Sequence, residues 1–459
     1  MSGQSESGPF SPPPDRYDSS LGEALAWLDR HINLEAIESG KAGRYSLPTL
    51  ERISALESAM GDPHLSYPVI HITGTNGKGS TSRMATSLLI AAGINPGTFI
   101  SPHLETINER LSVGGEAISD TELAQQLLSL AELEVFIGVK ATWFELLTAA
   151  AFSWFADRAV EAGVIEVGLG GRWDATNVVD SAVSVVTNVE LDHVAILGST
   201  REAIAAEKAG IVKAGGWLVL GEEEPSVADV FLQAAERVGA AGVWRRGEDY
   251  GAEASRLALG GRVVDLYTPY GRYEDVFVPL FGAHQAANAA CALAAVQAFL
   301  GAGLGEQVVA DGFAAVRAPG RLEVVARAPT VLLDGAHNVA GAEAAGAALH
   351  EDFRPGPASS GRRVIVVMGC LRGREPLELL SALGPDQLSH VVACEAPSPR
   401  SLGADVVLEA ARAVGLTGED GGSVSDALDR ARELARDGDL IFVTGSLYVA
   451  GEARALLAH

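Results

Sequence analysis

Short β-branched, apolar runs alternate along this chain with longer stretches whose apolar residues recur at helical spacing. The clearest example is the run Val69–Thr73, followed by a glycine-bearing turn and an amphipathic stretch closed by Gly93. This order predicts a strand, a loop and a helix. Such alternation is typical of an α/β domain with a doubly wound, mostly parallel sheet. Further elements are predicted over 21–34, 47–60 and 144–162 (helices) and over 164–167, 183–189 and 217–220 (strands).

The pattern changes near residue 255, where shorter strand-like runs extend to 281 and a helix over 286–300 follows. Arg317–Arg321 contains Pro and Gly and is the expected hinge. Beyond it, strands and helices alternate again and predict a second, smaller α/β domain. Its strands are expected at 330–333, 363–368, 390–393 and 440–444. The predicted organisation is a disordered tail (1–18), a first domain (19–316), the hinge (317–321) and a second domain (322–459).

Composition supports a globular, cytoplasmic protein. Of the 459 residues, 47% are hydrophobic and 20% charged, which allows more than one buried core. The three cysteines form no CxxC pair, so neither a disulfide framework nor a zinc site is predicted. The tail is rich in Ser, Gly and Pro and lacks the features of a signal peptide. The longest apolar stretches are shorter than the roughly 20 residues that span a bilayer.

The net charge of −25 argues against nucleic acid or an anionic membrane as a partner, because both require basic surface. It also repels ATP. Any nucleotide site in this chain must therefore concentrate hydrogen-bond donors and positive charge locally.

The segment Gly74–Ser80, with sequence GTNGKGS, is such a place. It follows a predicted strand and precedes a helix, so its backbone N–H groups can converge on a polyphosphate, with Lys78 near the β and γ oxygens. It departs from the strict P-loop pattern because Ile72 stands at the first glycine position and Gly79 separates Lys78 from Ser80. A glycine-rich turn without a ligand is the alternative.

Ser101, Glu166 and His193 each stand at the end of a predicted strand or just beyond it. In doubly wound sheets the carboxyl ends of strands border the ligand crevice. A hydroxyl, a carboxylate and an imidazole there can hold Mg²⁺ between protein and phosphates. Taken singly, each of these residues is equally typical of a structural role.

Similar strand-end turns recur elsewhere, but their local sequence is a weaker indication of a ligand site. Asp334 and His337 follow the strand at 330–333, and Ser446 follows the strand at 440–444. A capping turn is the alternative for the first two. Arg321, at the hinge, is placed to reach a phosphate. Lys208, in Glu207–Ile211, has on spacing alone the pattern of a solvated helix lysine.

Together these segments resemble the folylpolyglutamate/dihydrofolate synthase family of Mur-ligase-like amide synthetases. The matching segments occur in family order and extend to the C-terminus, which makes the set far more specific than any member. They are His71–Ser80, Ser101–Leu104, Glu166–Asn177, Leu191–His193, Glu207–Ile211, His284–Asn288, Pro319–Arg321, Asp334–Asn338 and Thr444–Tyr448.

The resemblance implies an N-terminal ATPase domain, a Rossmann-like C-terminal domain, and ATP with Mg²⁺ bound at two sites. The phosphates would be bound by Thr75, Asn76, Gly77, Lys78, Gly79 and Ser80. The metal sites would include Ser101, Glu166 and His193. Lys208 matches the family's carbamylated lysine, whose added carboxylate would bind the second Mg²⁺. Nucleotide contacts are implied for Asn288, Arg321 and Asp334.

The same resemblance assigns substrate-binding residues. The pterin part of the substrate would contact Thr142, Trp143, Phe144, Glu145, Trp173 and Asp174. His337 and Ser446 would receive the incoming glutamate. Three places depart from the family pattern: Val339 stands where Pro is frequent, the loop Cys370–Pro376 replaces an acidic and lysine-bearing run, and the segment before residue 46 matches poorly.

The implied activity is an ATP-dependent ligase acting as a monomer on glutamate and a folate or dihydropteroate carboxylate. The carboxylate attacks the γ-phosphate to give an acyl phosphate and ADP, and the glutamate amine then expels phosphate. One alternative is a Mur-type ligase for a cell-wall nucleotide precursor, although the loop reads Lys-Gly-Ser and no separate domain is predicted before residue 60. Another is a nucleotide-regulated binding protein without turnover.

Overall fold

A computed structural model describes residues 19–33, 35, 49–353 and 362–457. The chain forms two compact units. The first contains the described parts of 1–255 together with 263–278 and 286–316, and the second contains 256–262, 279–285 and the described parts of 317–459. The predicted tail (1–18) and the helix ends predicted at 34 and 47 lie outside the described residues. The domain limits at 316 and 322 stay a prediction.

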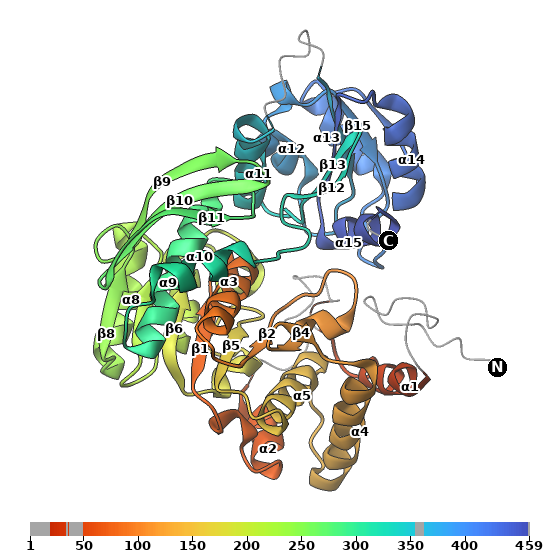
Figure 1. Cartoon of the computed structure of the whole chain (residues 1–459). Coiled ribbons are helices and arrows are strands. Elements are labelled where there is room, and N and C mark those ends of the chain that lie inside the picture. Colours follow the sequence, from red (N-terminus) through yellow and green to blue (C-terminus); the bar gives the residue numbers. More distant parts are fainter. Residues whose placement is uncertain (1–18, 34, 36–48, 354–361, 458–459) are drawn as a thin grey trace, which may run out of the picture. The chain divides into compact units, whose positions relative to one another are not determined.

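The first unit is built on an eight-stranded sheet with the order β4-β3-β2-β5-β1-β6-β7-β8 (Figure 1). The six strands from β2 to β8 in this order run parallel, and β3 and β4 add an antiparallel edge. Their bounds are β1 (Val69–Thr73), β2 (Pro96–Phe99), β3 (Leu111–Val113), β4 (Glu116–Ala117), β5 (Ala162–Glu166), β6 (Ser181–Val186), β7 (Trp217–Leu220) and β8 (Gly242–Arg245).

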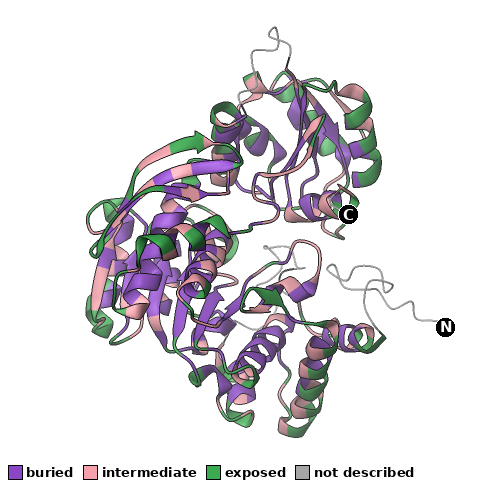
Figure 2. Ribbon diagram, in the orientation of Figure 1, coloured by how far each residue is buried: buried purple, intermediate pink, exposed green. Residues whose placement is uncertain are grey.

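Helices cover this sheet and bury its apolar side chains. One core joins α1, α2, α4 and α5 to the sheet, and a second lies beside α7 and α8. The central strands β1 and β5 are buried along their whole length, and the middle of this sheet is purple in Figure 2. The bounds are α1 (Ser19–Leu28), α2 (Glu51–Ala59), α3 (Lys78–Ala91), α4 (Asp120–Ile137), α5 (Trp143–Asp157), α6 (Val194–Leu197), α7 (Arg201–Lys208), α8 (Pro225–Val238), α9 (His284–Leu300) and α10 (Glu306–Ala314).

The strand-like region predicted at 255–281 forms a separate three-stranded sheet with the order β11-β10-β9. Buried and half-buried positions nearly alternate along β10, as expected when one face packs more closely than the other. The strands are β9 (Gly251–Ala258), β10 (Gly261–Thr268) and β11 (Gly271–Val278).

The second unit has a six-stranded sheet with the order β12-β13-β17-β14-β15-β16. All pairs except β12–β13 are parallel. Helices α11, α12 and α13 contribute to one core, and α14 and α15 to another. The bounds are β12 (Glu323–Arg327), β13 (Thr330–Leu333), β14 (Val364–Met368), β15 (His390–Ala393), β16 (Gly418–Asp420), β17 (Leu440–Thr444), α11 (Val339–Glu351), α12 (Pro376–Leu383), α13 (Ala404–Ala413), α14 (Val424–Leu434) and α15 (Leu447–Leu457).

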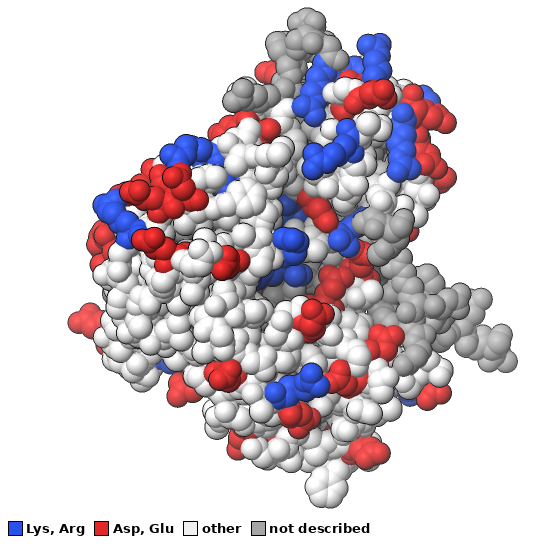
Figure 3. Space-filling model, in the orientation of Figure 1, with Lys and Arg blue, Asp and Glu red and all other residues white. Residues whose placement is uncertain are grey.

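The outer face of α14 carries both signs of charge, and Figure 3 shows Lys and Arg beside Asp and Glu there, at the upper right. Arg430 pairs with Glu419 and Glu433, and Arg432 pairs with Asp429. Opposite charges spaced in this way keep the helix solvated, because each basic group has an acidic neighbour. No helix among the described residues has the length and apolar character needed to cross a membrane.

Three of the predicted element ends lie three or more residues beyond the observed ends. The helix expected over 21–34 ends at Leu28, and the carbonyl of Ile32 instead accepts the N–H of Trp143. The helix expected to reach 162 ends at Asp157, because Ala159 turns the backbone into the left-handed region with φ of 47°. The strand expected to reach 189 ends at Val186.

Candidate active site

The loop between β1 and α3 is shaped by two glycines that no other residue can replace without displacement. Gly77 has a φ of 83°, and a Cβ there would lie 2.4 Å from Oδ1 of Asn288. A Cβ on Gly74 would lie 1.8 Å from Oγ1 of Thr187. Both distances are far inside van der Waals contact, so the close approach of the loop to its neighbours requires glycine. Asn288, on α9, therefore lies against the predicted phosphate loop.

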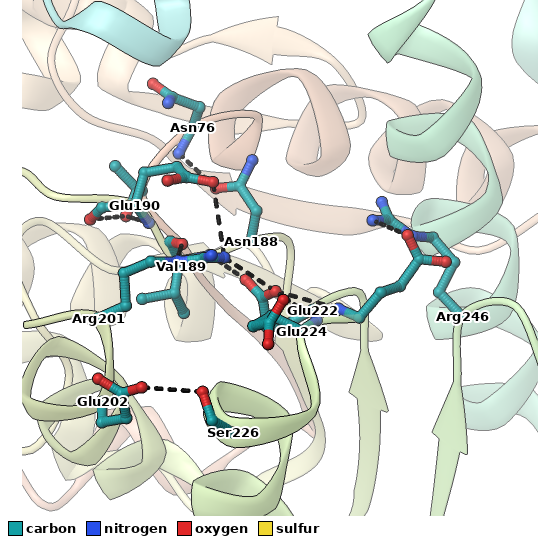
Figure 4. A network of polar contacts seen from close by, with 12 residues as sticks. Asn76, Asn188, Val189, Glu190, Arg201, Glu202, Glu222, Glu224, Ser226 and Arg246 are labelled. Atoms are coloured by element: carbon teal, nitrogen blue, oxygen red, sulfur yellow. Dashed lines mark hydrogen bonds and ion pairs between the residues drawn. The ribbon is translucent and has the colours of Figure 1, made fainter.

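The segment directly after β6 holds Thr75 and Asn76, which lie between these two glycines, by hydrogen bonds. Asn188 accepts the N–H of Thr75 with its carbonyl at 3.0 Å and the N–H of Asn76 with Oδ1 at 2.9 Å. Thr75 Oγ1 accepts the Glu190 N–H at 2.9 Å and lies 3.1 Å from the Glu190 carbonyl. Figure 4 shows the Asn76–Asn188 contact at the edge of a larger polar network. The loop conformation is thus fixed from outside the strand–loop–helix unit.

Two lysines converge on the same loop carbonyl. Lys78 donates to the carbonyls of Gly74 and Thr75 at 3.0 and 3.2 Å, and Lys208 donates to Gly74 at 2.8 Å. Lys208 is only 4% exposed, so the pattern of a solvated helix lysine was misleading. Burial, and secondarily the charge of Lys78, lower the Lys208 pKa to about 7, although Asp192 and Asp174 oppose the shift. A large fraction of this amine is therefore neutral near pH 7.

Ser101 and Glu166 are brought together because β2 and β5 are parallel neighbours. Oε2 of Glu166 accepts the backbone N–H of Ser101 at 3.2 Å, and this carboxylate is 3% exposed. A Cβ on Gly79 would lie 3.5 Å from the same oxygen, so Glu166 borders the first turn of α3. These two residues and the phosphate loop occupy one edge of the sheet.

His193 contacts its neighbour Asp192. It adopts a left-handed conformation with φ of 49° immediately before α6, and its N–H donates to Oδ1 of Asp192 at 2.8 Å. Asp192 in turn is one of the charges acting on Lys208. Within the ranges that the structure describes, no three His, Cys, Asp or Glu side chains are close enough together to hold a metal ion.

The residues predicted to contact the pterin mostly shape the start of α5. Thr142 caps this helix and forms a capping box with Glu145, which also pairs with Nε of Arg52 at 2.9 Å. Trp143 is 1% exposed and donates Nε1–H to Asp29. Phe144 lies against Gly168, where a Cβ would come within 2.6 Å of its ring. Their role in substrate binding stays a prediction.

Trp173 and Asp174 are neighbours with opposite environments. Trp173 is 51% exposed, whereas Asp174 is buried and accepts the N–H groups of Leu169 and Thr176 at 2.9 and 3.0 Å. Burial raises the Asp174 pKa, although these hydrogen bonds oppose the shift. Thr176 Oγ1 also contacts Nε2 of His71, on β1, at 2.8 Å. The chain from Asp174 through Thr176 to His71 ties this loop to the central strand.

In the second unit, β13 and β17 are parallel neighbours, so the turns that follow them share one edge. Asp334 accepts the N–H groups of Leu322 and Ala336 at 2.9 and 2.8 Å, and burial raises its pKa against the opposing charge of Arg321. Nδ1 of His337 contacts the Gly335 carbonyl at 2.9 Å. Ser446 is buried and accepts the Val449 N–H at 3.2 Å, which caps α15.

The sequence prediction missed Asn188, Arg201 and Glu222. Glu222 opens an acidic run, Glu222–Glu224, that is typical of a solvated loop, yet it is buried. Asn188 follows β6 directly and Glu222 lies two residues beyond β7, at the same edge as the phosphate loop. The rule that ligand sites border the carboxyl ends of parallel strands could have pointed to both.

Comparison with known families places both α/β parts of the chain among the Mur ligases. The "Mur ligase middle domain" matches residues 72–296, and the "Mur ligase, glutamate ligase domain" matches residues 320–447. The dihydrofolate synthase/folylpolyglutamate synthase of Mycobacterium tuberculosis is 39% identical, with 90% of each chain covered. That of Escherichia coli is 33% identical, with 96% of each chain covered. The chain belongs to the dihydrofolate synthase/folylpolyglutamate synthase family.

Solved structures agree with the sequence relatives. A Mycobacterium tuberculosis folylpolyglutamate synthase with ADP and AMPPCP matches with a TM-score of 0.85 and 36% identity, covering 96% of this chain and 99% of that one. An Escherichia coli FolC structure with DHPP and ADP matches with a TM-score of 0.83 and 31% identity, covering 97% and 99%. The protein is an ATP-dependent ligase that joins glutamate to a folate-type carboxylate. The cell-wall and non-enzymatic alternatives are not supported.

Proposed function

We propose that Thr75–Ser80 bind the phosphates of ATP and that Lys78 stabilises the transferring phosphoryl group. The observation that carries this proposal is the position of Lys78, which begins α3 and donates its amine to the Gly74 and Thr75 carbonyls at 3.0 and 3.2 Å. It places a positive charge at the loop in a protein whose net charge is −25. When a triphosphate enters, Lys78 exchanges its loop carbonyls for phosphate oxygens, which hold the negative charge that develops during transfer.

The reaction then proceeds in two displacements. An oxygen of the folate carboxylate attacks the γ-phosphorus, and the bond from phosphorus to the bridging oxygen breaks to release ADP. The amine of glutamate attacks the resulting acyl carbon, loses a proton and expels inorganic phosphate. Asn288, Arg321 and Asp334 are proposed nucleotide contacts, and His337 and Ser446 are proposed to bind glutamate.

Mg²⁺ fits the donors at the edge of the first sheet. Mg²⁺ in phosphate-transfer sites prefers oxygen and takes one or two carboxylates together with substrate phosphates. Glu166 supplies a buried carboxylate next to Ser101 and to the first turn of α3. Ser101, Glu166 and His193 would hold the ion, which when bound neutralises phosphate charge.

A carbamate on Lys208 would supply a further carboxylate. The neutral Nζ would attack the carbon of CO₂, forming an N–C bond and releasing one proton, so that a neutral amine becomes a carbamate with one negative charge. Burial of Lys208 and the nearby Lys78 support this step because both favour the neutral amine.

Trp173 and Asp174, with Thr142–Glu145, are proposed to surround the pterin.

We propose that the enzyme uses both dihydropteroate and reduced folates, because relatives from Mycobacterium tuberculosis, Bacillus subtilis and Escherichia coli carry both activities in their names. The relative from Lacticaseibacillus casei is named a folylpolyglutamate synthase only. The first domain is proposed to span 19–316 and the second 322–459. A monomeric state and a cytoplasmic location stay predictions.

Lys78→Ala tests the phosphate-loop proposal. This side chain is partly exposed and its amine donates to loop carbonyls, so its loss should leave the thermal unfolding temperature nearly unchanged. Ligation should fall at least about a hundredfold, because removal of one preorganised charge donor costs that much in comparable sites. ADP affinity should fall as well, measured by calorimetry. A folded Lys78→Ala protein with near-normal ligation would refute the assignment.

A further inference from the structure

We infer that Glu222 and Arg201 are positioning residues for the nucleotide site. Together they hold the segment Asn188–Glu190, and through this segment they hold Thr75 and Asn76 in the arrangement that binds phosphate. The inference rests on the proposed function of the phosphate loop and adds residues that do not themselves touch it.

Glu222 is only 7% exposed, and its carboxylate accepts hydrogen bonds from three parts of the chain. Its Oε2 accepts the N–H of Val189 at 2.8 Å. Its Oε1 accepts the N–H groups of Glu223 and Glu224 at 3.1 and 2.9 Å and Nη2 of Arg201 at 3.0 Å. A buried carboxylate is stable only when its oxygens are satisfied and its charge is balanced, and this one meets both conditions.

Arg201 binds the carbonyl of Val189, the residue whose N–H donates to Glu222. Its Nε donates to the Val189 carbonyl at 2.8 Å, while Nη2 reaches Glu222 and lies 3.6 Å from Oε1 of Glu190. The N–H of Val189 is therefore held by Glu222 and its C=O by Arg201, as Figure 4 shows. The planar guanidinium can make these contacts at once, which an ammonium cannot.

Val189 lies between the two residues that bind the phosphate loop. Asn188 accepts the N–H groups of Thr75 and Asn76, and Glu190 exchanges hydrogen bonds with Thr75 Oγ1. Because the peptide units on both sides of Val189 are rigid, a shift of Val189 moves these partners. The orientation of the loop N–H groups thus depends on the Glu222–Arg201 pair.

Helix α7 links this pair to the second lysine. Arg201 is its first residue and Lys208 its last, and Lys208 donates to the Gly74 carbonyl at 2.8 Å. The helix is therefore tied to the region of the phosphate loop at both ends, through Val189 at one end and directly at the other. Loosening of the Arg201 end should disturb the placement of Lys208 as well.

The test compares Glu222→Gln and Arg201→Lys with matched neighbours. Glu202→Gln alters the next residue of α7, whose exposed carboxylate accepts a hydrogen bond from Ser226, and Arg246→Lys alters the nearby pair with Glu223. We expect both test variants to weaken ADP binding about tenfold and to raise the KM for ATP, as losses of orienting partners do elsewhere. Amide hydrogen exchange in the peptide containing Thr75 and Asn76 should become faster. The two controls should match the parent protein.

The outcomes separate this inference from the proposed function. If Lys78→Ala keeps its ADP affinity, the phosphate-loop assignment itself fails. If Lys78→Ala loses affinity while Glu222→Gln and Arg201→Lys keep parental affinity and loop exchange, only the positioning role fails, even if their unfolding temperatures fall. Should Glu222→Gln not fold, Arg201→Lys decides the question, because it preserves the charge that balances Glu222 and changes only the geometry.

Discussion

Individual residues in this site are defined by their surroundings more than by their types. Lys78 and Lys208 have the same side chain and share an acceptor, yet their burial differs. Lys208 is buried behind the loop, and this burial lowers its pKa to about 7. Lys208 is thereby suited to be neutral and open to modification, whereas the partly exposed Lys78 is proposed to face phosphate.

Lys208→Ala tests the proposed carbamate at the residue scale. Loss of a ligand carboxylate should reduce ligation by at least about tenfold and raise the Mg²⁺ concentration needed for activity. Added acetate should restore part of the activity. Mass spectrometry of the native protein in bicarbonate should find the mass of one CO₂ added at Lys208. An active, metal-loaded enzyme with unmodified Lys208 would contradict the proposal, as would a fully active Lys208→Ala protein.

At the scale of elements, the site depends on the residues that come directly after each strand. Val69–Thr73 and Gly74–Ser80 could be predicted because the apolar run and the glycines are local signals. The end of β6 could not, since Thr187 and Val189 continue a β-branched pattern, whereas the Thr187 hydroxyl and Asn188 bond to the phosphate loop and the Val189 N–H bonds to Glu222. The burial of Glu222 likewise depends on Arg201, which is distant in sequence.

Strand β1 also makes a testable contribution to stability through His71. Burial lowers the pKa of His71 from 6.5 to about 3, so the folded state stays neutral there while the unfolded chain takes up a proton. The stability that the neutral His71 contributes is complete above about pH 6.5. It is lost as pH falls toward 3, because the unfolded state then binds more protons. The unfolding temperature of the His71→Gln protein should therefore fall less on mild acidification than that of the parent protein.

The control for this prediction is His350→Gln, which alters an exposed histidine at the end of α11. It should keep the pH dependence of the parent protein. Thermal unfolding at neutral and mildly acidic pH measures both variants. An unchanged pH dependence in His71→Gln would show that His71 already takes up its proton in the folded state.

For the whole molecule, the ordered set of motifs was a better guide than any single motif. The alternation of strands and helices was enough to predict two α/β folds, and strands such as Thr330–Leu333 and Leu440–Thr444 lie where they were expected. The assignment of residues 256–262 and 279–285 to the second unit was not predictable, because it follows from long-range packing. The strongly acidic chain nevertheless binds an anionic nucleotide, and Lys78, at the start of α3, offers local positive charge at the proposed site.

The most direct test of the account is the joint measurement of ADP release and product formation by the purified enzyme. ATP, Mg²⁺ and glutamate are supplied with dihydropteroate or with tetrahydrofolate, and products are separated by mass spectrometry. We predict one ADP for each glutamate joined, with both acceptors, and little ADP when either the acceptor or glutamate is omitted. ADP release that needs neither co-substrate, or that yields no glutamylated product, would contradict the proposed acyl-phosphate ligase.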